Sequence, residues 1–190
     1  MPPKQRITKE MIMEASLSLV REGGIESVNS RAVAAKIGCS TQPVFSQYPT
    51  MEDLRQAIHD YCCEEFEQTI LAEKDSIDFL KKSCIALIQL ARNDKNVFSL
   101  IFLSTYCAGS EFQLSRMNYK TNQLLLSSLM KNYSLTNEEA LNILERLSLL
   151  VHGIASIIAT TNAVYSDTQA WFIINQTFND MIKGLKNIHD

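Results

Sequence analysis

The stretch SRAVAAKIGCSTQPVFSQYPT, residues 30–50, joins two short helix-forming runs through a glycine. Two closely crossing helices need a small residue at the crossing, a turn residue that tolerates positive φ, and an aliphatic anchor on the second helix. Ala34, Gly38 and Val44 supply these at relative positions 0, +4 and +10. Pro43 falls in the first turn of the second run, where its missing N–H costs little. The stretch therefore predicts a helix-turn-helix.

The second helix of this motif, expected from about Thr41 to Gln47, has an uncharged polar outer face. Its expected exposed residues are Thr41, Gln42, Ser46 and Gln47, side chains suited to hydrogen-bonding base edges in the major groove. Arg31, at the start of the preceding helix, can contact a guanine with two hydrogen bonds. The spacing alone also fits a buried two-helix corner with ordinary polar residues outside.

Helical signals precede this motif. Residues 8–22 have apolar positions at helical spacing after Thr8, a plausible N-cap, and Gly23-Gly24 ends the run. Asn29 and Ser40 are the expected N-caps of the two short helices. The motif is therefore expected to be the second part of a three-helix unit.

The rest of the chain continues the helical pattern, and β signals are almost absent. Pro49 ends the third helix, and a long fourth helix should reach to about residue 73. Further helices are expected at about 76–92, 95–106, 112–132, 137–162 and 168–187. Capping boxes are expected at Thr50/Asp53, Thr136/Glu139 and Ser166/Gln169. We predict an all-α protein in which the long fourth helix joins an N-terminal helix-turn-helix domain to a second helical domain.

Charge divides the chain in the same way. Its formal net charge is −3 over 190 residues, but residues 1–50 hold six Lys/Arg against four Glu, and residues 51–190 hold twelve against seventeen acidic residues. A mildly basic module at 1–50 and an acidic module at 51–190 suit different partners. We expect a DNA-binding domain over 1–50 and an effector-binding and dimerisation domain over 51–190.

Cysteine usage and hydropathy indicate the compartment. Five cysteines without repeating spacing, and no cationic-then-apolar leader, argue against a secreted disulfide scaffold. The most apolar run, 147–159, is well short of the ~20 residues of a membrane span. We expect a cytoplasmic protein that does not cross a membrane.

The sequence SVNSRAVAAKIGCSTQPVFSQYPTMEDLRQAI, within residues 7–58, resembles the DNA-binding region of the tetracycline-repressor (TetR) family of bacterial transcriptional regulators. The resemblance implies base contacts from Arg31, Thr41 and Gln42, with Tyr48 in the usual aromatic place. Relatives commonly have Tyr at the position of Phe45 and Lys at that of Met51, both for phosphate contacts. The predicted DNA-binding residues are Arg31, Lys36, Ser40, Thr41, Gln42, Phe45, Ser46, Gln47 and Tyr48. Because Phe45 has no hydroxyl and Met51 no charge, the phosphate contacts are expected instead from the amide end of the fourth helix and from the side chains of Lys4, Arg6 and Lys36.

The function that this resemblance implies is a homodimeric, ligand-responsive repressor that places two recognition helices on a palindromic operator. Helix 137–162 is apolar nearly all round and needs partners on more than one side. A second copy, packing through this helix and the last one, supplies them. The predicted dimer contacts are Leu150, Ile154, Ile157, Ile158, Trp171 and Phe178.

A pocket for a small, mainly apolar effector is expected among the central helices. Its predicted lining is Phe98, Phe102, Tyr106, Met117, Tyr119, Leu124 and His152, since aromatic and Met side chains suit an apolar ligand. Each of these residues, taken singly, also fits an ordinary core position, which is the commoner role of such side chains.

Other interpretations remain open. His59, Cys62 and Cys63 fall at i, i+3 and i+4 and could share a soft metal, which would give a metal- or thiol-responsive regulator. Phosphate-loop, nucleophile-elbow and zinc-hydrolase motifs are missing, so we expect neither an enzyme nor a cofactor. Phe45 and Met51 also fit a helical dimerisation protein that keeps a relic DNA-binding fold and binds a protein partner.

Overall fold

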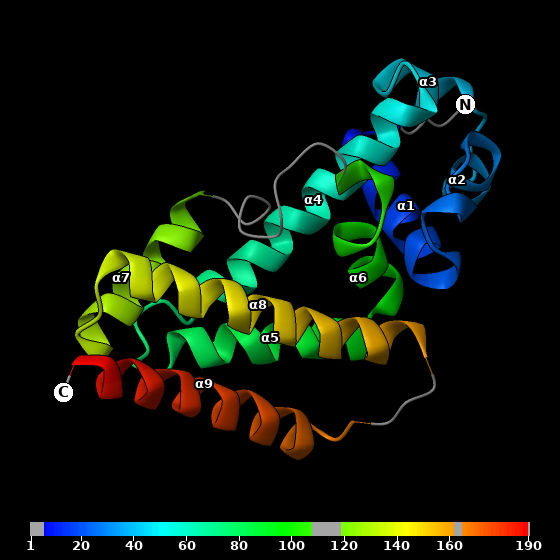
Figure 1. Cartoon of the computed structure of the whole chain (residues 1–190). Helices are drawn as coiled ribbons and strands as arrows, with labels where there is room; N and C mark the ends of the chain where they lie inside the picture. The colour runs from blue at the N-terminus through cyan, green and yellow to red at the C-terminus, as the bar shows by residue number, and fades with distance from the viewer. Residues whose placement is uncertain (1–5, 108–118, 162–164, 190) are drawn as a thin grey trace.

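The computed structural model describes residues 6–107, 119–161 and 165–189, which are helical with no strand among them, as predicted (Figure 1). Residues 112–118, expected to begin a helix, lie outside the described residues. The elements are α1 (Lys9–Gly23), η1 (Ile25–Ser27), α2 (Ser30–Ile37), α3 (Gln42–Gln47), α4 (Met51–Leu71), α5 (Phe79–Asn93), α6 (Lys95–Phe102), η2 (Thr105–Cys107), α7 (Tyr119–Tyr133), α8 (Asn137–Thr160) and α9 (Asp167–His189).

Side-chain caps set most of the helix starts. The Thr8 hydroxyl accepts from the Met11 amide, and the Asn29 side chain accepts from the Ala32 amide at 3.0 Å. The three predicted capping boxes are present at α4, α8 and α9. The predicted cap at Ser40 is wrong, because α3 begins one residue later than a Ser40 cap would place it, with Thr41 at the N-cap and no side-chain cap bond.

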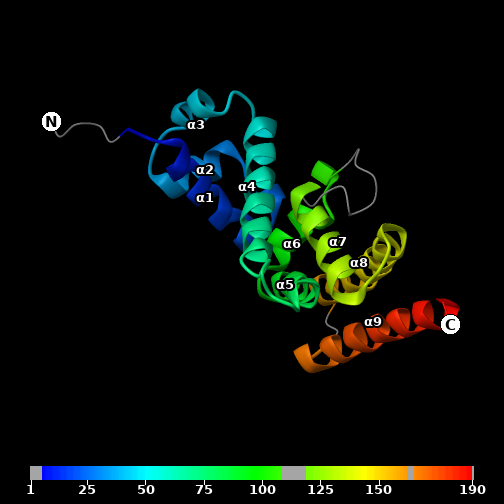
Figure 2. The same ribbon diagram turned by 90° about the vertical axis from the view of Figure 1, so that its left-hand side faces the viewer.

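The two larger hydrophobic clusters of the described residues lie in different parts of the molecule, and α4 contributes to both. The first cluster joins α1–α3 to Leu54, Ile58 and Cys62 of α4 and to the buried face of α6. The second joins α5, α7, α8 and α9 to Ile70, near the end of α4. Figure 2 shows α4 standing between the N-terminal helices and the remaining ones. Helix α4 therefore packs against both the N-terminal helices and the remaining ones.

Polar contacts reinforce this arrangement at two places. Arg21, in the last turn of α1, pairs with Asp94 at 3.0 Å, and Asn96 donates to the Arg21 carbonyl at 2.8 Å. Arg92 of α5 pairs with Asp167 and donates to the Tyr165 carbonyl at 2.6 Å, which holds the start of α9. Both ion pairs are accessible to solvent and contribute little, so apolar packing supplies most of the stability of this arrangement.

Helix α8 packs between α5 and α9 and also contacts α6 and α7. Among the described residues it is the one helix whose length and composition would allow it to span a bilayer, and a third of that span is buried within the chain. A core helix of a soluble protein meets the same criteria. Its remaining apolar surface needs a partner.

Candidate nucleic-acid interface and ligand cavity

The turn between α2 and α3 depends on the backbone of Gly38. Its φ of 78° and ψ of 35° lie in the left-handed region, and its N–H bonds to the carbonyls of Ala34 and Ala35. Val33 and Val44 are fully buried and Ala34 nearly so, which locks the two helices together in the first cluster. The small residue, turn residue and aliphatic anchor thus take the predicted places.

Helix α3 points its polar residues away from this core, at the end of the molecule remote from α9 (Figure 1). Gln42, Phe45 and Ser46 are exposed, whereas Thr41 and Gln47 are half-buried. The Ser46 hydroxyl donates to the Gln42 carbonyl at 2.9 Å, so its proton is engaged within the helix. Ser40, in the turn before α3, is exposed.

Tyr48 and Met51 serve the core more than the surface. Tyr48 is 9% exposed, and the Lys9 ammonium lies 5.5 Å from its ring centroid. Burial, aided by the nearby Glu10, raises the pKa of the Tyr48 hydroxyl. Met51 is half-buried against the first cluster. Met51, where the resemblance implies a lysine, therefore has a packing role.

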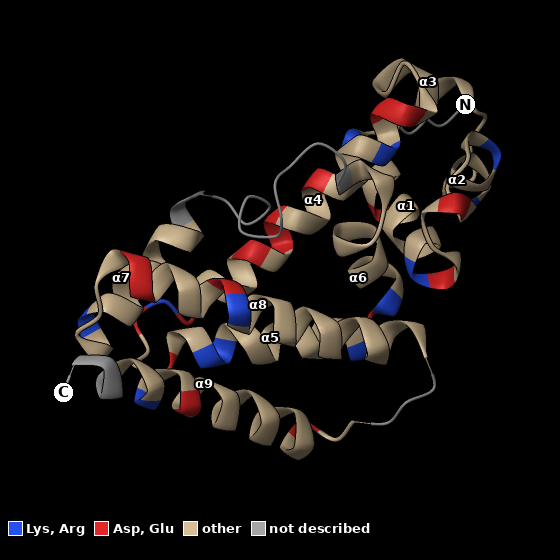
Figure 3. Ribbon diagram, in the orientation of Figure 1, with Lys and Arg blue, Asp and Glu red and all other residues tan. Residues whose placement is uncertain are grey.

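Positive charge lies beside α3 and not on it. In Figure 3, α3 carries neither basic nor acidic residues. Arg6, Lys9 and Arg31 are exposed, and Lys9 lies over the ring of Tyr48, the residue that follows α3. Lys36 instead pairs with Glu22 at 2.6 Å and, with Ser18, lowers the pKa of that carboxyl. Lys4 lies outside the described residues. Phosphate binding by Lys36 would have to compete with Glu22.

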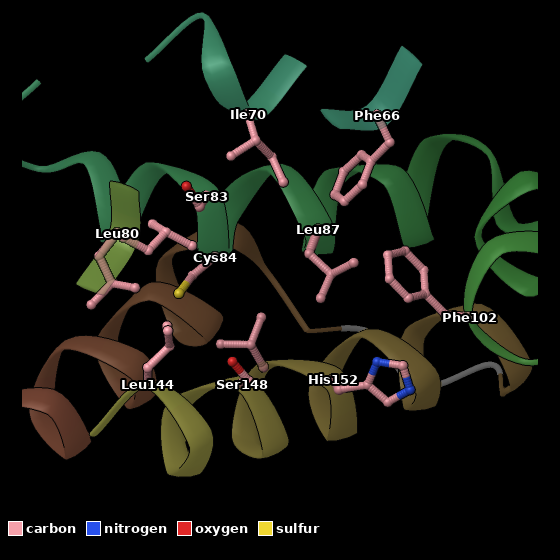
Figure 4. Close-up of a pocket in the computed structure, with 12 residues that line it drawn as sticks. Phe66, Ile70, Leu80, Ser83, Cys84, Leu87, Phe102, Leu144, Ser148 and His152 are labelled. Atoms are coloured by element: carbon pink, nitrogen blue, oxygen red, sulfur yellow. The ribbon is translucent and has the colours of Figure 1, made fainter. Parts of the chain in front are cut away.

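A cavity of about 60 Å³ lies in the body between α4, α5, α6, α7 and α8. Phe66, Phe102 and His152 gather at one end, and Leu80, Cys84 and Leu144 lie at the other (Figure 4). Its lining is Phe66, Ile70, Leu80, Ser83, Cys84, Leu87, Phe102, Leu125, Leu144, Ser148, Val151 and His152, which includes no Asp, Glu, Lys or Arg. Burial raises the pKa of the Cys84 thiol to about 12, so it stays protonated at neutral pH.

Aromatic contacts close one end of this cavity. The Phe102 ring meets Phe66 edge-on at 5.6 Å, His152 edge-on at 5.7 Å and Phe98 at 5.3 Å between centroids. Phe102 and His152 line the cavity, as predicted. Phe98 is fully buried behind them, and Leu124 packs against the second cluster.

Two other predicted lining residues, Met117 and the side chain of Tyr119, lie outside the described residues.

Tyr106, also predicted to line the cavity, lies away from it. The Tyr106 hydroxyl donates to Glu52 at 3.3 Å, and the Tyr106 ring stacks on His59 with 6.2 Å between centroids; both partners are on α4. Burial is the main cause of its raised pKa. Arg55, on the same face of α4, donates to the Val28 carbonyl at 3.1 Å. Tyr106 thus docks on the half of α4 that supports the helix-turn-helix.

Ser148 and Cys84 line the cavity although the sequence did not predict them there. A signal existed for one of them, because Ser148 and His152 are polar residues at i and i+4 within the apolar helix α8. The Ser83 hydroxyl, another unpredicted group, donates to the Phe79 carbonyl at 2.8 Å.

The structure does not favour a metal centre on α4. Cys62 is 4% exposed within the first cluster, and burial raises the pKa of its thiol to about 11. Cys63 instead contacts His59, with Sγ 3.6 Å from Nε2. Within the described ranges, no three His, Cys, Asp or Glu side chains are placed to share an ion.

The predicted dimer residues differ in exposure. Ile154 and Phe178 are buried in the core of a single chain, so they offer no surface to a second copy. Leu150 and Ile158 are half-buried, and Ile157 and Trp171 are exposed. Leu149 and Phe172, which the sequence did not predict, are more exposed still.

These features define an all-helical protein with a helix-turn-helix at one end and a cavity in its helical body. It has the fold of the TetR-family regulators. A TetR variant from Acinetobacter baumannii AYE in complex with minocycline matches with a TM-score of 0.63 and 16% identity over 97% of this chain and 99% of that one. A TetR-family member from Streptomyces coelicolor A3 matches with a TM-score of 0.63 and 18% identity over 88% and 96%. A transcriptional-regulator structure from Pseudomonas aeruginosa PAO1 gives 0.69 and 16% over 94% of each chain. No protein-family model and no curated protein sequence matches the chain.

Proposed function

We propose that this protein is a cytoplasmic, homodimeric transcriptional repressor that binds a palindromic operator and is released from it by a small molecule. The carrying observation is the Gly38 turn, which presents Gln42, Phe45 and Ser46 at one end of a fold found in transcriptional regulators. The proposal gives the chain no catalytic role and no cofactor, and it keeps residues 1–50 as the DNA-binding domain.

A second copy is the proposed partner of the exposed apolar surface on α8 and α9. Leu149 is 52% and Ile157 40% exposed, and both lie on one stripe of α8 together with Gly153. Phe172 adds a largely exposed ring on α9. Packing these helices against their symmetry mates would bury the stripes, and a C2 dimer would set two α3 helices about 34–36 Å apart, one DNA turn.

The cavity is the proposed effector site, and its chemistry selects an uncharged ligand. Its walls are aliphatic and aromatic, with Ser148, His152 and the protonated thiol of Cys84 as polar groups. A buried ion without a counter-charge would be strongly disfavoured there. The volume of about 60 Å³ is small, so a drug-sized ligand would have to displace side chains of the wall.

Displacement at Phe102 would reach α4 directly. Phe102 lies at the end of α6 and lines the cavity. Four residues later, the Tyr106 hydroxyl donates a hydrogen bond to Glu52 of α4. Arg55, one turn further along α4 than Glu52, donates a hydrogen bond to the carbonyl of Val28, just before α2. A ligand that prefers a shifted α6 would tilt α4 and change the separation of the two α3 helices.

Selection of bound sequences from random duplex DNA tests the proposal. We expect a palindrome whose half-site centres are about 10 base pairs apart. Arg31→Ala should cost about 1 to 3 kcal/mol of binding and relax preference at one base pair. Lys36→Ala should reduce the salt slope by roughly one.

Lys82→Ala is the matched control, because Lys82 pairs with Glu73 at 2.7 Å much as Lys36 pairs with Glu22, but in the body. It should leave the salt slope unchanged. If the selection enriches no sequence, the repressor proposal fails and a protein partner for the N-terminal domain takes its place.

A further inference from the structure

We propose that Phe45 reads the methyl group of a thymine in each half of the operator. This inference rests on the proposed function, and it assigns a specific base group to a residue that lacks the hydroxyl a phosphate contact would use.

The position of Phe45 is the first observation. Its ring is 43% exposed on the outer face of α3, between Gln42 and Ser46, while the adjacent Val44 is fully buried. Among the residues that the structure describes, no aromatic or cationic side chain stacks on this ring. An isolated exposed hydrophobe is common on a protein surface. Phe45, however, shares the outer face of α3 with Gln42 and Ser46, the face that the proposed function turns toward the groove.

The chemistry of the neighbouring groups is the second observation. The Ser46 proton is engaged on the Gln42 carbonyl, and no residue of α3 is charged. Ser46 is therefore left as a hydrogen-bond acceptor only, and the Gln42 amide and the Phe45 ring are the two larger exposed side chains of α3. The amide suits adenine, which offers one donor and one acceptor on its major-groove edge.

The groove offers one apolar group that a benzyl ring can recognise. Thymine carries a C5-methyl on its major-groove edge, and apolar side chains contact it. The base paired with the adenine that suits Gln42 is itself a thymine. Gln42 and Phe45, three residues apart on one face of α3, are thus placed to read neighbouring A·T pairs.

Replacing thymine by deoxyuridine removes only this methyl, so it isolates the contact. The experiment uses the full-length protein and the duplex recovered by selection, with each thymine replaced in turn together with its symmetry mate. Affinity is measured by fluorescence anisotropy at fixed salt. Desolvating one methyl predicts about fourfold weaker binding per half-site and about fifteenfold for both, at one symmetric pair of positions.

Two variants make the assignment specific. Phe45→Ala should bind the thymine and deoxyuridine duplexes within about twofold of one another at that pair of positions. Ser46→Ala, whose hydroxyl is engaged within the helix, should keep the wild-type sensitivity. Circular dichroism checks that both variants keep their helical content.

Uniform tolerance of deoxyuridine on a recovered operator would overturn the thymine contact and leave the repressor proposal standing. Equal methyl sensitivity in Phe45→Ala and wild type would overturn the assignment to Phe45. If selection recovers no operator, both proposals fail together, and the exposed ring is better explained as part of a protein-binding surface.

Discussion

Replacing Gly38 by alanine should destabilise the protein by about 1 kcal/mol. An added Cβ would meet no heavy atom within 4 Å, so the cost comes from the backbone alone. Holding an L-residue in the left-handed region costs about 1 to 2 kcal/mol. The reduced entropy of the unfolded chain returns about 0.4 to 1 kcal/mol. Urea unfolding followed by far-ultraviolet circular dichroism measures the difference.

Three further substitutions separate this cause from general effects. Gly38→Asn should be close to wild type, because asparagine tolerates the left-handed region. Gly24→Ala should cost more than Gly38→Ala, because φ 75° with ψ 179° is a region nearly restricted to glycine. Gly184 lies within helix α9, and an added Cβ there would meet no heavy atom within 4 Å, so Gly184→Ala should stabilise the protein by about 0.5 to 1 kcal/mol. The reasoning fails if Gly38→Ala stabilises as Gly184→Ala does, or if asparagine at position 38 is no better than alanine.

The buried thiols and the dimer surface lead to two more predictions. Burial holds the pKa of Cys84 at about 12 and that of Cys62 at about 11, against 9.0 for an exposed thiol. The unfolded state therefore loses protons first as pH rises, and each thiol should lower the free energy of unfolding by about 1.4 kcal/mol between about pH 8 and about pH 10. Urea titrations should show this loss in wild type and a smaller one in the Cys62→Ala/Cys84→Ala variant; an equal loss in both would contradict the burial argument. At the proposed interface, Ile157→Asp should weaken the dimer by about 2 kcal/mol or more, roughly thirtyfold, because it places a charge in an apolar contact. Sedimentation of Ile157→Asp should then show monomer. Leu103→Asp is the control and should stay dimeric, because Leu103 is 44% exposed near the end of α6, away from the proposed interface. A dimeric Ile157→Asp would refute the interface.

Helix starts were predictable because capping is local. The Thr50/Asp53 box and the Asn29 cap each join residues three apart in the sequence, and the structure has both. The start of α3 was harder, since Ser40 and Thr41 are both good N-cap types. There Pro43 fixes its own φ within the first turn, and the helix begins without a side-chain cap. A capping residue type therefore predicts a helix start only when its partner amide is within reach.

The cavity and the exposed apolar surface of α8 were less predictable, because both depend on packing. Periodicity finds the apolar positions of α8 but does not say which are covered by its own chain. Ile154 is buried by that packing, whereas Leu149 is left half exposed. In the same way, Cys84 and Leu144 meet across a void that depends on how α5 and α8 approach each other.

Under the proposed function, Phe102 is the residue through which so small a cavity would affect a distant DNA contact. This ring lines the cavity and also packs against the first hydrophobic cluster, which holds the helix-turn-helix. Phe66 of α4 touches both clusters and meets the Phe102 ring edge-on. A ligand that moves Phe102 must therefore alter the packing of the first cluster. Under the proposed function, the conformation that binds DNA would disfavour the ligand by the same free energy by which the ligand disfavours DNA binding. A coupling free energy of about 1 to 3 kcal/mol would change operator affinity about 5- to 150-fold. One rearranged aromatic contact and one broken hydrogen bond together supply a free energy of that size. Release thus requires no large cavity, only a ligand whose bound state excludes the present position of Phe102.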